Sequence, residues 1–138
     1  MRIMAIDYGD AHTGIAISDP TGFLAGFTTV INAYRPEVVA EQVAALAKEH
    51  GVEELVLGHP INMDGTRGPR SEKAQAMKAL LEETASLPVV LWDERRTTID
   101  AHQILMNSGK NAKKRRKVVD AVAASLILEG YLTVKKSH

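Results

Sequence analysis

The first quarter of the chain consists of short apolar runs separated by polar residues. The segments RIMAID (residues 2–7), GIAISD (14–19) and GFLAGFTTVIN (22–32) each have the length and apolar content of a β-strand. The first two are separated only by the turn YGDAHT (8–13). We therefore expect the chain to begin with a β-meander.

From residue 36 onward, helical spacing alternates with short apolar runs. Apolar positions three and four residues apart predict a helix from Pro36 to a stop at Gly51 and a second helix over 71–85. Between and after these helices we expect a buried strand over 55–57 closed by Gly58, a turn-rich loop over 61–71 and a strand over 89–94 opened by Pro88. Two more helices are expected to follow. One runs over 97–109, capped by Thr97 or Thr98 and ended by Gly109, and the last runs over 117–134.

This order of elements predicts the fold class. Three strands followed by alternating helices and strands favour an α/β or α+β domain whose mixed sheet has antiparallel strands at one side and parallel strands at the other. A length of 138 residues suits one domain, and we see no repeat or linker that would divide it.

Composition narrows the class of protein. Hydrophobic residues make up 45% of the chain and charged residues 25%, and no apolar run approaches the roughly 18 residues that cross a bilayer. The first apolar run reaches an acid at Asp7, so it does not resemble a signal peptide. Cysteine is absent, which excludes disulfides and thiolate metal sites. We expect a cytoplasmic protein.

The net charge of zero conceals a strong asymmetry along the chain. Residues 1–66 hold three Lys or Arg against nine acids, whereas the remainder holds fourteen against eight. The segment KNAKKRRK (110–117) alone places six bases in eight residues. Such a run is either a solvated surface segment or a site for the phosphates of a nucleic acid, and the run alone does not decide between the two.

Acids follow the predicted strands at positions where open α/β sheets bind ligands. Parallel strands end at one edge of the sheet, and Asp7 and the pair Asp93 and Glu94 each come at a strand end. With a period of two, Asp7 shares a face with Ile3 and Ala5, so we expect it to lean toward the core. A third acid, Asp120, lies on the apolar stripe of the last helix, which continues through Ala123, Ala124, Ile127, Leu128 and Tyr131.

Each acid alone has a structural explanation, as a helix first-turn residue, a turn cap or an ion-pair partner of Arg95 or Arg96. Several buried carboxylates together, however, need a cation. Magnesium or manganese suits carboxylate oxygens and substrate phosphates, and two such ions ~4 Å apart can activate water for phosphodiester hydrolysis. His59 either orients a water molecule or is a structural histidine.

The chain contains, in order, the blocks DYGDAHTGIAISD, LVLGHPINMDGTRGP, DERRTT and KKRRKVVDAVAASLILEGYL. Together these four blocks resemble the YqgF/RuvX family of Holliday-junction-resolvase-like proteins, which is associated with pre-16S rRNA processing. The resemblance covers nearly the whole chain. It implies a ribonuclease H-like fold with a mixed five-stranded sheet flanked by helices, and a catalytic metal-binding triad of Asp7, Glu94 and Asp120. The spacing alone does not decide whether Asp93 or Glu94 is the metal ligand, and the resemblance favours Glu94.

The resemblance also implies a function. It indicates a magnesium- or manganese-dependent nuclease that matures the 5′ end of precursor 16S rRNA or resolves branched DNA. The implied phosphate contacts are Lys113, Lys114, Arg115, Arg116, Arg95 and Arg67, the last in a loop over 62–70 that either closes over the substrate or is a plain surface loop. His12, Thr13 and His59 depart from the family pattern, which affects the expected substrate contacts and not the triad.

Two other classes compete with this interpretation. Kinases of the actin and sugar-kinase type share the fold and an Asp-x-Gly turn, but they need a second domain for which this chain has no room. A non-catalytic nucleic-acid-binding module with structural acids is the other. The oligomeric state, monomer or homodimer, is open at this point.

Overall fold

The computed structural model describes residues 2–19, 25–59, 68–93 and 112–136, and for 25, 69, 70, 112–121, 135 and 136 it describes the backbone alone. In chain order the elements are β1 (Arg2–Asp7), β2 (His12–Ser18), β3 (Ala25–Asn32), α1 (Pro36–His50), β4 (Val52–His59), α2 (Pro69–Ala85), β5 (Val89–Asp93) and α4 (Ala112–Lys136). None of the helices in these ranges is both long and apolar enough to span a membrane.

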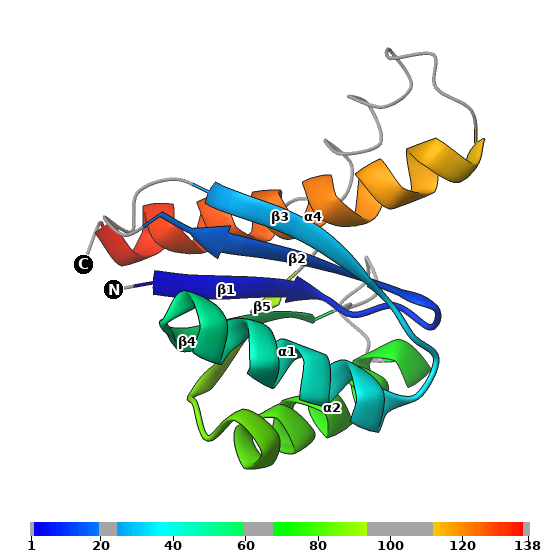
Figure 1. Ribbon diagram of the computed structural model, residues 1–138, viewed down its shortest axis with the longest axis horizontal. Coiled ribbons are helices and arrows are strands. Elements are labelled where there is room, and N and C mark those ends of the chain that lie inside the picture. The colour runs from blue at the N-terminus through cyan, green and yellow to red at the C-terminus, as the bar shows by residue number, and fades with distance from the viewer. Residues whose placement is uncertain (1, 20–24, 60–67, 94–111, 137–138) are drawn as a thin grey trace.

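The strands form one mixed sheet in the order β3-β2-β1-β4-β5. The meander pairs β1 with β2 and β2 with β3 in antiparallel fashion, whereas β4 is parallel to both β1 and β5. The predicted division into an antiparallel and a parallel side is therefore confirmed. Helices α1 and α2 cover one face of the sheet, and α4 crosses the other (Figure 1).

The first hydrophobic core, the α1–α2 core, lies between the sheet and helices α1 and α2. Alternate strand residues point into it, such as Met4 and Ile6 of β1, because side chains of a strand alternate between the two faces. Most of the apolar positions expected to face the core are buried, namely Val39, Val43 and Ala47 on α1 and Ala74, Met77 and Leu81 on α2, whereas Leu46 and Leu80 are half-buried. Helix α1 ends where predicted, at Gly51, which has a left-handed backbone with φ 67°.

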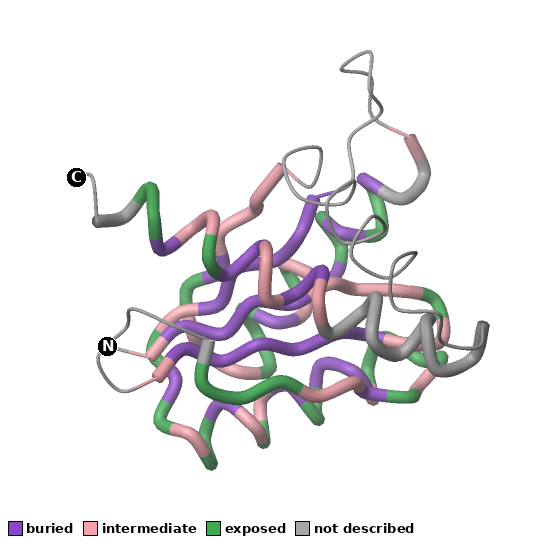
Figure 2. The backbone as a smooth tube through the Cα atoms, turned by 90° about the horizontal axis from the view of Figure 1, so that it is seen from above, coloured by how far each residue is buried: buried purple, intermediate pink, exposed green. Residues whose placement is uncertain are grey.

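The second core, the α4 core, is smaller and is built around alanines. Ala5 of β1 and Ala16 of β2 are both fully buried against the stripe of α4 that contains Ala124, Ile127 and Leu128. Small side chains on the sheet allow the helix to pack closely across β1 and β2. The buried tube in Figure 2 runs through the central strands, which both cores enclose.

Several element boundaries differ from the sequence-based expectation. Strand β2 begins at His12, two residues early, because His12 and Thr13 pair with β3. Strand β4 extends over Val52–His59 and not 55–57, because hydrogen bonding to β1 and β5 outweighs the weak strand propensity of its acids and glycine. Helix α4 begins at Ala112 and not at 117, so residues 112–117 of the basic run are helical. The helix expected over 97–109 lies outside the described residues.

Candidate active site

The carboxyl ends of the three parallel strands meet at one edge of the sheet. Strand β1 ends at Asp7, and β4 and β5 end together at the register pair His59 and Asp93. The first turns of α4 extend past this edge, beyond the arrowhead of β1 (Figure 1). The edge is the place where open α/β sheets bind ligands, and α4 brings a second element to it.

Asp7 lies on the α4 side of this edge. Ile3 and Ala5, which share its face, both pack in the α4 core. The residue is half-buried, and no hydrogen bond or ion pair joins its carboxylate to any residue that the structure describes. A partly desolvated carboxylate of this kind is suited to binding a cation.

Asp93 lies on the opposite face. Val89 and Leu91 of β5 pack in the α1–α2 core, whereas Trp92 packs against α4. The alternation of the strand therefore assigns Asp93 to the side of α1 and α2, away from Asp7. Its competitor Glu94, with Arg95, lies outside the described residues.

The third predicted acid, Asp120, is carried by α4. Its side chain is outside the described part of the chain, but the stripe predicted to follow it is confirmed, because Ala123, Ala124, Ile127 and Leu128 are buried. The backbone of residues 113–116 forms the first turns of the same helix. Arg67 lies outside the described residues. Among the residues that the structure does describe, no three His, Asp or Glu side chains form a group that could hold a metal ion.

The two histidines that differ from the family pattern, His12 and His59, make structural contacts. His59 is buried, and its Nε2 lies 2.6 Å from the Oγ of Ser71, a fully buried residue of α2. This contact links the end of β4 to the start of α2. It supports a structural role for His59 over the alternative role of orienting a water molecule. The Nδ1 of His12 lies 2.7 Å from the Oδ1 of Asn32 and joins β2 to β3.

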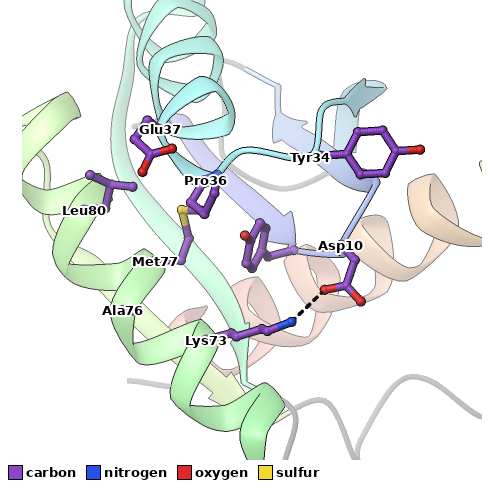
Figure 3. A pocket seen from close by; sticks show the side chains of 9 residues that line it. Asp10, Tyr34, Pro36, Glu37, Lys73, Ala76, Met77 and Leu80 are labelled. Atoms are coloured by element: carbon purple, nitrogen blue, oxygen red, sulfur yellow. Dashed lines mark hydrogen bonds and ion pairs between the residues drawn. The ribbon is translucent and has the colours of Figure 1, made fainter.

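A pocket of about 660 Å³ opens near the same edge, on the α1–α2 side. Its lining residues are Tyr8, Asp10, Tyr34, Pro36, Glu37, Lys73, Ala76, Met77 and Leu80 (Figure 3). Burial is the main cause that raises the pKa of the Tyr8 phenol above its ordinary value. No pattern in the sequence predicts this pocket, because its residues come from three segments that only the fold brings together.

Comparison with known proteins identifies the relatives of the chain. The description of the family that matches residues 1–134 is "RuvX: Holliday junction resolvase". Proteins named "Putative pre-16S rRNA nuclease" are 45% identical in Halothermothrix orenii and 42% identical in Bacillus subtilis. Each alignment covers 96% of this chain, and 94% and 97% of the respective relative.

Solved structures support the fold. RuvC of T. thermophilus in complex with a Holliday junction substrate superposes with a TM-score of 0.64 at 15% identity, covering 99% of this chain and 96% of RuvC. The expected ribonuclease H-like fold is thereby confirmed. An ROK hexokinase from Thermus thermophilus matches with a TM-score of 0.50 at 23% identity, but the chain spans only 38% of that kinase. The sequence match over nearly the whole chain and the shared fold together show that this chain belongs to the RuvX family.

Proposed function

We propose that the chain is a divalent-metal-dependent endonuclease that matures precursor 16S rRNA in the cytoplasm. The observation that carries the proposal is Asp7, a half-buried carboxylate with no partner among the described residues, at the edge where the first turns of α4 extend past the sheet. The names of the relatives supply the RNA substrate.

Asp7, the one member of the proposed set whose side chain the structure describes, suits a magnesium or manganese ion. Hard divalent ions take carboxylate oxygens, and Asp7 offers one at the sheet edge. In this proposal Glu94 and Asp120 complete the set. The assignment of Asp93 to the opposite face favours Glu94 over Asp93 as the partner of Asp7. Bound there, two such ions would activate water and stabilise the leaving oxygen of the phosphodiester.

The basic run acts on the substrate. Residues 113–116 occupy the first turns of α4, so in the proposal Lys113, Lys114, Arg115 and Arg116 contact phosphates near the acids, with Arg67 and Arg95 as further contacts. Such contacts position a nucleic acid without reading its sequence. Helical order fixes the backbone of the run beforehand, which lowers the entropy lost when it binds.

The proposal is tested by incubating labelled precursor 16S rRNA with the protein and manganese, beside Asp120→Asn. We expect cleavage by the wild type and loss of cleavage in the variant. A matched control is Glu53→Gln, which neutralises an exposed acid near the start of β4, at the opposite end of the sheet. Undiminished cleavage by Asp120→Asn would refute its catalytic role.

A second candidate function is the resolution of branched DNA. The description of the matching family and the fold shared with RuvC favour it. A four-way DNA junction in the same assay separates the two, because cleavage of the junction alone would replace the RNA assignment. Cleavage of neither substrate by the wild type would favour a non-catalytic binding module.

A further inference from the structure

The pocket on the α1–α2 side has an aromatic and apolar lining. Tyr8 comes from the loop after β1, and Tyr34 from the connection between β3 and α1. Opposite them, α2 contributes Met77 and Leu80, seen beside Pro36 in Figure 3. Tyr34 is 81% exposed, so one face of a large ring is available to a ligand without any rearrangement of the core.

The charges around the pocket are already neutralised. Asp10 pairs with the Nζ of Lys73 at 3.1 Å, and Glu37 lies 3.8 Å from the Nε of Arg35. Because each carboxylate has a cation beside it, the described residues around the pocket carry no excess positive charge for a phosphate group. It suits an uncharged flat ring that stacks on tyrosine and donates N–H groups to carboxylate oxygens.

The position of the pocket relates it to the candidate active site. Tyr8 directly follows Asp7 and packs against the α1–α2 core, whereas Asp7 lies on the α4 side. Consecutive residues therefore connect the two faces of the sheet at one edge. A polynucleotide strand held at Asp7 can place a neighbouring nucleotide across the edge, beside Tyr8.

We infer that this pocket binds an unpaired nucleobase of the RNA substrate, next to the nucleotide that is cleaved. The inference rests on the proposed function and adds to it a subsite for single-stranded RNA. Unpaired bases are commonly bound by stacking on aromatic side chains with hydrogen bonds to their edges. The volume of about 660 Å³ lies in the range typical of small-molecule pockets.

Binding without cleavage tests the inference. The affinity of a fluorescent single-stranded RNA from the precursor is measured by anisotropy, without divalent ions. Stacking is worth ~1–3 kcal/mol per base, so we expect Tyr34→Ala to weaken binding about 5- to 150-fold. Tyr34→Phe keeps the ring and should stay within about twofold of the wild type. The control Phe27→Ala, at an exposed ring of β3, should not change the affinity.

A structural role would not produce this pattern. Since Tyr34 is largely exposed, Tyr34→Ala should melt at the same temperature as the wild type. A single abasic site moved along the RNA should weaken wild-type binding at one position and cause no further loss in Tyr34→Ala. Coupling of this kind would identify the base that occupies the pocket.

The failures of the two proposals can be told apart. Unchanged RNA binding by Tyr34→Ala, or equal weakening by Tyr34→Phe, overturns the inference even if wild-type protein cleaves the precursor. Conversely, the expected binding pattern without cleavage by the wild type supports the pocket and overturns the nuclease assignment. No binding of RNA by the wild type overturns both.

Discussion

Gly130 of α4 faces the indole ring of Trp92, and this contact fixes the helix against the end of β5. A Cβ atom added at Gly130 would lie 2.9 Å from Cζ2 of Trp92. The indole also makes an edge-to-face contact with Tyr131, with ring centroids 6.1 Å apart, so its freedom to move is restricted. We therefore predict that Gly130→Ala destabilises the protein.

The expected magnitude is the difference of two opposing effects. Alanine in place of glycine within a helix gains about 1 kcal/mol of helix propensity. Overpacking a filled site costs about 1–3 kcal/mol. The net result for Gly130→Ala is a loss of about 1 kcal/mol, which corresponds to a melting temperature lower by about 3 °C.

In the background of Trp92→Phe, the effect of Gly130→Ala on the free energy of unfolding should change sign. Phenylalanine lacks the distal ring that carries Cζ2, so the clash disappears and the propensity gain remains. In that background we expect Gly130→Ala to stabilise by about 1 kcal/mol. Urea denaturation of the four proteins measures both values. Equal stabilisation in the two backgrounds would refute the close packing of α4 on Trp92.

Three further predictions concern pH, packing and charge. Burial and a hydrogen bond to Glu54 raise the pKa of Tyr131 to about 12, so stability should be full below pH 10 and fall toward pH 12, and Tyr131→Phe should flatten that decline in urea titrations. His59→Ala should lower the free energy of unfolding by about 1–3 kcal/mol because it removes a buried hydrogen bond. His12→Ala removes an exposed hydrogen bond and serves as the control, so an equally small loss in both variants would contradict the prediction. Replacing residues 113–116 by Gln should reduce the salt slope of RNA binding by up to about 3, and an unchanged slope would mean that the run is only solvated.

Periodicity in the sequence predicted the parts of the fold that depend on burial. The stripe of α4 and the face of Asp7 followed from periods of 3.6 and 2, because hydrophobic residues must face a core in both elements. The start of α4 was misjudged, because the consecutive bases of 113–117 show no apolar period although lysine and arginine favour helices.

The hydrophobic pattern of the sequence does not predict features that depend on tertiary contacts. Strand β4 was predicted too short because Glu53, Glu54 and Gly58 read as strand ends, and only pairing with the neighbouring strands extends it. The pocket was missed because its lining residues Tyr8 and Tyr34 lie far apart in the sequence, and only the fold brings them to one pocket. The assignment of Asp93 to the side away from Asp7 likewise required knowledge of the cores in which Val89, Leu91 and Trp92 pack.

The central claim is that Asp7 holds a divalent ion for hydrolysis of RNA. The direct measurement is manganese-dependent cleavage of precursor 16S rRNA by Asp7→Asn, with RNA binding measured in parallel. Residues that only support metal ligands cost about 10- to 100-fold when replaced, so we predict that loss of this ligand lowers the rate at least about a hundredfold while binding is retained. Cleavage by Asp7→Asn at the wild-type rate would contradict the account.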